Sequence, residues 1–285
     1  MPLHPHLHLL VPSSTASIAL EARVYISRSA AAALSGLATT STSSEPTPLE
    51  GLTDSQRATV AGLGIRKIVT AAHPWGRLGG NMLFPVIANY LPNAVFGTPR
   101  ADGAAPDTAI ATFNVRGVGQ SGGSMPLPGF GIGNDGEDFA AVERAVADLV
   151  GGQAELYRLG YSYGTNLALN APLPDRGVKR TILVSPAPTL FKAMTLLSGP
   201  TFATGLDAAL DRAAASRESG KDARSLWVVF GDKDDFTGAA TLRALGGDKK
   251  DEIVAVEISG CGHFYARVED GDAAEKAIAA WISDS

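Results

Sequence analysis

Short apolar runs alternate with segments of helical periodicity along most of this 285-residue chain. Several runs, such as Leu-Trp-Val-Val-Phe at 226–230, are unbroken, which is typical of strands buried on both faces. The predicted strands are 6–11, 18–26, 65–72, 109–115, 156–160, 181–185, 226–230 and 253–258, and the predicted helices are 81–91, 137–150, 162–171, 206–217, 237–245 and 272–282. This alternation predicts an α/β fold with a mainly parallel central sheet of about eight strands flanked by helices. The first two strands should be antiparallel because no helix separates them.

Two segments interrupt this pattern, and we expect both to lie within a single domain that spans residues 1–285. Residues 29–48 are rich in Ala, Ser and Thr and can bury little apolar surface, which predicts a flexible insertion over 29–63. Residues 186–220 are short for a cap domain, and we expect a lid-like segment there. Its apolar side chains would either roof a pocket or pack between helices.

The composition is typical of a soluble globular protein and argues against some partners. Hydrophobic residues make up 45% and charged residues 19%, with a net charge of −5 and no basic stripe, so nucleic acid is not an expected partner. No apolar run approaches the ~20 residues that a membrane helix needs. The N-terminus lacks the basic-then-apolar pattern of a secretory signal, and a single cysteine, Cys261, allows no internal disulfide. We therefore expect a cytoplasmic protein.

The strongest chemical signal follows the predicted strand at 156–160. Gly160-Tyr161-Ser162-Tyr163-Gly164 has the form G-x-S-x-G between a strand and a helix. In that setting the serine occupies a sharp turn that exposes its hydroxyl at the end of the sheet, and the glycines prevent collisions with neighbouring backbone. The helix N-terminus adds positive potential for a developing anion. We predict Ser162 as a nucleophile, and a serine that only caps the helix is the alternative.

A serine nucleophile needs a base and an acid that orients the base. Where G-x-S-x-G joins a strand to a helix in an α/β sheet, the acid follows the serine along the chain and the histidine follows the acid. His263 is the only histidine after Ser162, and it comes directly after the last predicted strand. The preceding strand is followed by three carboxylates, Asp232, Asp234 and Asp235. We predict Asp234 as the acid that holds the imidazole tautomer and stabilises the imidazolium, with Asp235 as second candidate and Asp232 as third.

Two backbone N–H groups should form an oxyanion hole. One is that of Tyr163, the residue after the nucleophile, and the second should come from the loop after the third strand, 72–80. Pro74 has no N–H to donate, so we predict Trp75, with Gly76 as the alternative. His73 should order this loop by hydrogen bonding.

A second glycine motif, Arg-Gly-Val-Gly-Gln-Ser-Gly at 116–122, contains the G-x-G-x-x-G fingerprint of dinucleotide binding. That fingerprint must open a helix, so that a pyrophosphate meets the helix N-terminus. Prolines follow at 126 and 128 instead and favour a loop. We therefore expect no cofactor. His4, His6 and His8 would place three imidazoles on one face of a strand, but a zinc site needs a further ligand or water in a closed geometry, so we expect no metal.

Four segments together resemble one group of α/β-hydrolases, the small serine hydrolases related to dienelactone hydrolase. The group carries a His-Pro-His-Pro-x-x-Gly-Gly loop, an Asn-x-Arg-Gly-x-Gly-x-Ser segment, G-x-S-x-G and a C-terminal Gly-x-x-His-Phe. The matching residues here are His73-Pro74 with Gly79-Gly80, segment 114–121, the turn at Ser162 and Gly262-His263-Phe264. Trp75-Gly76 stands where the group has His-Pro, and the 29–63 insertion is foreign to its compact members. From about residue 65 onward, the resemblance implies the α/β-hydrolase fold and its triad.

These residues predict a serine hydrolase that forms an acyl-enzyme on Ser162. We expect a small-molecule acyl substrate, either a carboxylic ester, a lactone or a thioester, in a pocket lined by Phe84, Phe130, Phe191 and Met194. Acyl transfer, cyclisation or carbon–carbon bond hydrolysis by the same triad is the first alternative. A non-catalytic interaction protein on the same fold is the second.

Overall fold

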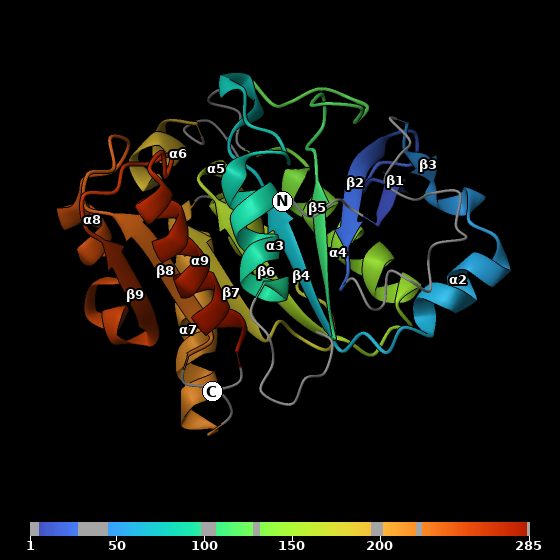
Figure 1. The fold of residues 1–285 in the computed structure, drawn as a ribbon. Helices are drawn as coiled ribbons and strands as arrows, with labels where there is room; N and C mark the ends of the chain where they lie inside the picture. Colours follow the sequence, from blue (N-terminus) through green and yellow to red (C-terminus); the bar gives the residue numbers. More distant parts are fainter. Residues whose placement is uncertain are drawn as a thin grey trace.

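The computed structural model describes residues 6–27, 45–97, 107–127, 132–194, 202–220 and 224–283. In this part of the chain nine strands form one sheet in the order β3-β1-β2-β5-β4-β6-β7-β8-β9 (Figure 1). The strands are β1 (Leu7–Pro12), β2 (Ala19–Tyr25), β3 (Thr47–Pro48), β4 (Lys67–Ala72), β5 (Thr108–Phe113), β6 (Glu155–Tyr161), β7 (Arg180–Val184), β8 (Leu226–Gly231) and β9 (Ile253–Ile258). β2 is antiparallel to β1 and β5, and all other neighbours are parallel. The predicted mainly parallel sheet with an antiparallel start is confirmed, with one strand more than expected.

Helices cover both faces of the sheet, as predicted. α4 (Asp135–Leu149), α5 (Tyr163–Asn170) and α7 (Phe202–Glu218) lie on one face, and α3 (Leu91–Phe96) and α9 (Val268–Ile282) lie on the other (Figure 1). The shorter elements are α2 (Asp54–Ala61), α6 (Pro188–Met194), α8 (Ala239–Arg243), the 3₁₀ turns η2 (Leu49–Gly51), η3 (Gly76–Leu78) and η5 (Gly247–Glu252), and the π-helical turn η4 (Val86–Tyr90). Among the residues described, no helix has the length and apolar character needed to cross a lipid bilayer.

The central strands are buried on both faces, which explains their unbroken apolar sequences. Every residue of β5, β7 and β8 is buried, and successive side chains point to opposite faces of the sheet. In β8, Val228 joins the core under α4, α5 and α7, whereas Val229 joins the core under α3 and α9. Because both cores hold the strands, the loops at the carboxyl ends of the strands start from fixed positions.

Part of the segment expected to be a flexible insertion carries regular structure. Residues 45–63 contain β3, η2 and α2, and Val60 of α2 and Leu52 are buried in the main core. A capping box opens α2, since the Thr53 hydroxyl accepts the N–H of Gln56 and the Gln56 side chain accepts the N–H of Thr53. The expected insertion therefore does not extend over 45–63, and residues 28–44 lie outside the described residues.

The segment 186–220, expected to be lid-like, is in part a helix of the sheet layer. Leu206 and Leu210 of α7 are buried in the core that α4 and α5 share, and α7 packs along α5. α7 therefore covers the sheet and is no lid. Of the remaining lid segment the structure describes α6, and residues 195–201 lie outside the described part of the chain.

The helix predicted over 81–91 begins and ends later than expected. Helical structure starts after Pro85, and the N–H of Leu91 bonds to the carbonyl of Val86 in a π-helical turn. Pro92, the second residue of α3, has no N–H to donate, and it lies where the π-helical turn passes into the α-helix. A proline favours a helix end at the residue before it, which is why the pattern predicts an end at Leu91.

Candidate active site

Ser162 lies in the turn between β6 and α5, at the carboxyl ends of the parallel strands. Its φ of 54° and ψ of −116° place it in a region of backbone space that residues with a side chain rarely adopt. The N–H of Ser162 bonds to the carbonyl of Val184 in the neighbouring strand β7 at 2.9 Å, which holds the turn against the sheet. The predicted strand–turn–helix setting of this serine is therefore present.

The two glycines of the G-x-S-x-G motif let α5 approach the sheet closely. A Cβ built on Gly160 would lie 2.4 Å from the carbonyl oxygen of Gly164, and a Cβ built on Gly164 would lie 2.2 Å from the carbonyl oxygen of Ala72 in β4. Both neighbours are backbone atoms, which cannot turn aside as a side chain can. The glycines are thus required by the packing between β4, β6 and α5.

Replacing Gly164 by alanine is expected to lower the free energy of unfolding by about 3 kcal/mol or more, because α5 must move away from β4 to admit the methyl group. Gly238→Ala is the matched control, since a Cβ there meets no atom within 4 Å and its φ is −59°. That control should change stability by less than about 1 kcal/mol. Urea unfolding followed by circular dichroism measures both, and equal stabilities for the two variants would contradict this account of the turn.

The structure brings the three predicted triad side chains together. Nε2 of His263 lies 2.9 Å from Oγ of Ser162, and Nδ1 of His263 lies 2.8 Å from Oδ2 of Asp234. All three residues are buried, with at most 7% of each exposed. The distances fit an imidazole that donates its Nδ1–H to the carboxylate and accepts the serine hydroxyl at Nε2.

The three candidate carboxylates differ in their exposure and hydrogen bonds. Oδ1 of Asp234 accepts the backbone N–H groups of Phe236 and Thr237 at 2.8 and 3.0 Å, which fixes the carboxylate while Oδ2 faces His263. Asp235 is exposed. Oδ1 of Asp232 accepts the N–H of Gly260 and so links the loop after β8 to the loop after β9. Asp234 alone among the three contacts the imidazole.

The loop predicted to carry the second oxyanion donor follows β4 and lies next to the Ser162 turn, since Ala72 pairs with Gly160. Trp75 opens the 3₁₀ turn η3 and is partly buried against the core. Its carbonyl accepts the N–H groups of Leu78 and Gly80, and these two hydrogen bonds close the loop into a tight turn. The oxyanion roles of Trp75 and Tyr163 remain predictions.

His73 orders this loop and is fully buried. Its Nδ1 contacts the carbonyl of Pro74 at 2.5 Å, and its Nε2 accepts the N–H of Val115 at 3.1 Å. Burial lowers the pKa of His73 to about 4, against the smaller opposite effect of the Pro74 carbonyl. A neutral imidazole with the proton on Nδ1 therefore joins the loop after β4 to the segment after β5, as the sequence suggested.

The Asn-x-Arg-Gly-x-Gly-x-Ser segment has a structural role in this region. The Asn114 side chain accepts the N–H of Met82 and donates to Glu21, whose carboxylate also accepts the N–H of Gln120. The Ser121 hydroxyl donates to the Asn114 carbonyl at 2.6 Å. Described residues 114–127 form a loop with no helix, so the segment lacks the geometry of a dinucleotide fingerprint.

Aromatic side chains surround His263. Phe84, one of the predicted pocket residues, packs 5.7 Å from the Tyr161 ring, and the Tyr161 hydroxyl donates to the carbonyl of His263 at 2.9 Å. Sequence reasoning missed Phe236, whose only signal was its place two residues after Asp234. Phe130 lies outside the described residues, Phe191 and Met194 lie on α6 with side chains outside the description, and their pocket roles remain predictions.

A second buried carboxyl lies behind the nucleophile turn, and no sequence signal pointed to it. Asp135 opens α4, is 1% exposed, and its Oδ2 accepts the hydroxyl of Tyr163 at 2.6 Å. Its Oδ1 is buried with no hydrogen-bond partner among the described residues. Burial raises the pKa of Asp135 to about 7, partly offset by the Tyr163 hydroxyl. The Tyr163 side chain therefore ties the residue after Ser162 to the start of α4.

The raised pKa of Asp135 predicts a specific pH dependence of stability. The folded carboxyl keeps its proton up to about pH 7, whereas the unfolded carboxyl loses it near its ordinary value of 3.8. Its stabilising contribution is thus complete below pH 4 and is lost as the pH rises towards 7. Asp135→Asn carries no charge, so its free energy of unfolding relative to the natural protein should rise by about 2 kcal/mol from pH 5 to pH 8.

The matched control for this pH series is Glu137→Gln, which removes an exposed carboxyl from the same turn of α4. Its stability difference from the natural protein should stay within about 0.5 kcal/mol across the pH range. Urea unfolding at several pH values gives both curves. A pH-independent difference for Asp135→Asn would show that this carboxyl is ionised in the folded state throughout.

The only cysteine in the chain, Cys261, is a poor candidate for the nucleophile. It is fully buried, and burial, aided by the nearby Asp270, raises its pKa to about 12. The thiolate, which is the reactive form, is therefore scarce at neutral pH. The serine hydroxyl, not this thiol, contacts the imidazole of His263.

No protein-family model and no curated protein matches this chain. Solved structures do match it over nearly its whole length. An alpha-beta serine hydrolase homologue from Coxiella burnetii is 18% identical, with 99% of this chain and 100% of that chain covered and a TM-score of 0.62. A member of the a/b serine hydrolases without a lid, from Xanthomonas campestris, is 18% identical with both chains fully covered and a TM-score of 0.60.

A Pyrobaculum calidifontis esterase is 19% identical, with 98% of this chain and 84% of that chain covered and a TM-score of 0.54. At these identities the likeness concerns the fold. The sheet order, the helices on both faces and the strand–turn–helix at Ser162 agree with it. The chain has the α/β-hydrolase fold.

Proposed function

We propose that this protein is a serine hydrolase that cleaves a carboxylic ester, lactone or thioester through an acyl-enzyme on Ser162. The observation that carries the proposal is the unbroken chain of contacts from Ser162 Oγ to His263 Nε2 at 2.9 Å and from His263 Nδ1 to Asp234 Oδ2 at 2.8 Å. Such a chain activates a hydroxyl that is otherwise a weak nucleophile. The shared fold with a serine hydrolase homologue and an esterase gives further support.

In the acylation step, Ser162 Oγ bonds to the carbonyl carbon of the substrate while His263 Nε2 takes the hydroxyl proton. The carbonyl oxygen becomes an oxyanion, which the N–H groups of Tyr163 and Trp75 would stabilise. The bond to the leaving group then breaks, and His263 returns its proton to the departing oxygen or sulfur. Asp234 stabilises the imidazolium throughout and keeps its own charge.

In the deacylation step, His263 takes a proton from a water molecule, whose oxygen bonds to the acyl carbon. The bond to Ser162 Oγ breaks, the serine regains its proton from His263, and a carboxylic acid leaves. Every group needed for these proton transfers is present on the chain, and water is the only co-reactant.

A panel of small acetate esters, γ-lactones and acetyl thioesters, followed by acid release in a pH-stat, tests the proposal. We expect turnover of at least one class, with the carboxylic acid as product in water. Product analysis with added methanol separates hydrolysis from acyl transfer. Acyl products that form only when an alcohol acceptor is present would contradict the proposed hydrolysis.

A further inference from the structure

Three phenylalanine rings form one aromatic cluster with His263. The Phe236 ring lies 4.3 Å from the imidazole at an interplanar angle of 42°, and the Phe264 ring lies 5.2 Å from it at 86°. Phe264 also contacts Phe236 at 5.7 Å and Phe84 at 6.2 Å. The rings come from three separate loops, after β8, after β9 and before η4, so the fold assembles the cluster around the imidazole.

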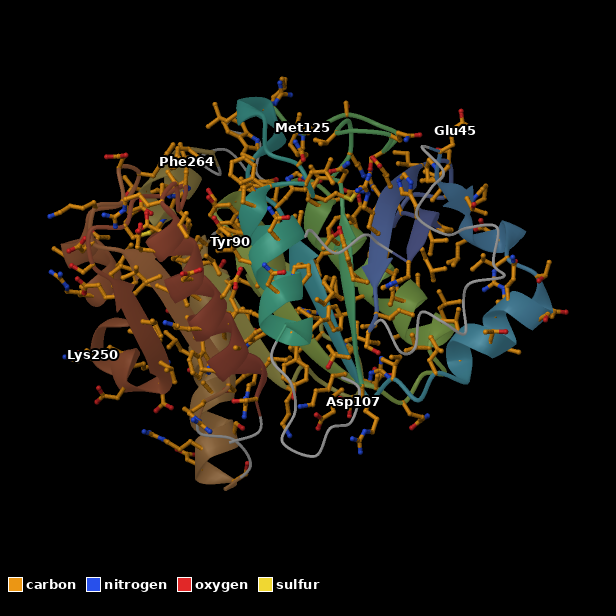
Figure 2. All side chains as sticks on the ribbon, in the orientation of Figure 1. Glu45, Tyr90, Asp107, Met125, Lys250 and Phe264 are labelled. Carbon is orange, nitrogen blue, oxygen red and sulfur yellow. The ribbon has the colours of Figure 1, made fainter. Side chains whose placement is uncertain are left out.

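This cluster is only partly buried, unlike the cores above and below the sheet. Phe264 is 49% exposed. Phe84 and Phe236 are each partly covered. Phe264 lies at the same end of the sheet as Met125, opposite to Asp107, which precedes β5 (Figure 2). Partly exposed aromatic side chains beside a reactive group are typical of a binding surface.

The reaction of the triad determines which part of a substrate would lie against these rings. His263 Nε2 must reach the leaving atom to give it a proton, whereas the acyl carbon is bonded to Ser162 Oγ. The leaving group therefore projects from the imidazole side of the site, where Phe236 and Phe264 lie against the ring of His263. The acyl group stays on the Ser162 side of the imidazole.

Aromatic rings bind a flat or bulky apolar group well, through burial and edge or face contacts. The same surroundings disfavour a leaving group with unpaired polar atoms, because those atoms lose water without gaining a partner. We propose that Phe84, Phe236 and Phe264 form a leaving-group subsite and that the natural substrate is an ester of an aromatic or bulky apolar alcohol. This inference rests on the proposed function of Ser162.

Two acetate esters with the same acyl group and similarly basic alkoxides, benzyl acetate and ethyl acetate, test the subsite. We expect kcat/KM for benzyl acetate to exceed that for ethyl acetate by about 10-fold or more. Phe264→Ala should reduce this ratio to about 3 or less, and Phe264→Leu should retain part of it because apolar bulk remains. Leu173→Ala, which trims an exposed apolar side chain after α5, should leave the ratio unchanged.

A binding measurement on Ser162→Ala keeps the subsite separate from the proposed reaction. Ser162→Ala is titrated with each ester, and binding is followed by NMR. Benzyl acetate should bind more tightly than ethyl acetate, and this preference should disappear in the double variant with Phe264→Ala. That result supports the subsite whether or not the natural protein hydrolyses the esters. Failure to hydrolyse either ester would count against the proposed function and not against the subsite. Equal binding of the two esters, or a preference that survives Phe264→Ala, would overturn the subsite.

Discussion

Replacing Ser162 by alanine is expected to lower kcat for the proposed ester hydrolysis by a factor on the order of 10⁴ to 10⁶. The change removes the hydroxyl that lies 2.9 Å from His263 Nε2 and leaves no atom there that can bond to the acyl carbon. Folding should be retained, because the backbone N–H that holds the turn to Val184 is unchanged. Initial rates of ester hydrolysis, with circular dichroism as a check on folding, measure the effect.

The control for this variant is Ser124→Ala, which changes an exposed serine in the loop after β5. Its rate should match that of the natural protein. A well-folded Ser162→Ala protein with more than about 1% of the original kcat would refute the nucleophile assignment.

Replacing Asp234 by asparagine is expected to lower kcat by a factor on the order of 10⁴. Two backbone N–H groups, those of Phe236 and Thr237, point at Oδ1, so the asparagine oxygen must take that place. Its NH₂ group then faces His263 Nδ1, which becomes an acceptor and forces the imidazole proton onto Nε2. An imidazole protonated at Nε2 cannot take the proton of Ser162.

The control is Asp235→Asn, which removes the neighbouring carboxylate at an exposed position. Its kcat should stay within about twofold of the original, as expected for a surface charge with no contact to the reacting atoms. The same rate assay covers both variants. Full activity in Asp234→Asn together with loss of activity in Asp235→Asn would mean that Asp235 orients the imidazole in solution.

The sequence predicted which three side chains lie together at the end of the sheet, because its signals are local and ordered. The glycines around Ser162 mark a close approach of α5 to the sheet, and parallel strands bring the residues that follow them to one edge. Only one histidine, His263, follows Ser162, as the order serine, acid, histidine requires. The sequence favoured Asp234 over Asp235 by position alone. The physical reason, two backbone N–H groups that hold the Asp234 carboxylate, is visible only in the structure.

The sequence predicted the surroundings of the triad less well, for identifiable reasons. Phe236 contacts His263, and Asp135 contacts Tyr163. Both contacts join residues that are distant in sequence, and hydrophobic periodicity cannot predict such contacts. The helix at Asp54–Ala61 had a usable signal, since Thr53 and Gln56 have the spacing of a capping box. The low-complexity stretch before it favoured an insertion and outweighed that signal.

The most direct test of the central claim is covalent labelling with a fluorophosphonate, whose phosphorus reacts with an activated serine hydroxyl. Peptide mass spectrometry of the labelled protein should place a single adduct on Ser162, and Asp234→Asn should slow its formation by a large factor. An adduct at another residue, or none from a folded protein at neutral pH, would contradict the assignment of Ser162, His263 and Asp234 as a working triad.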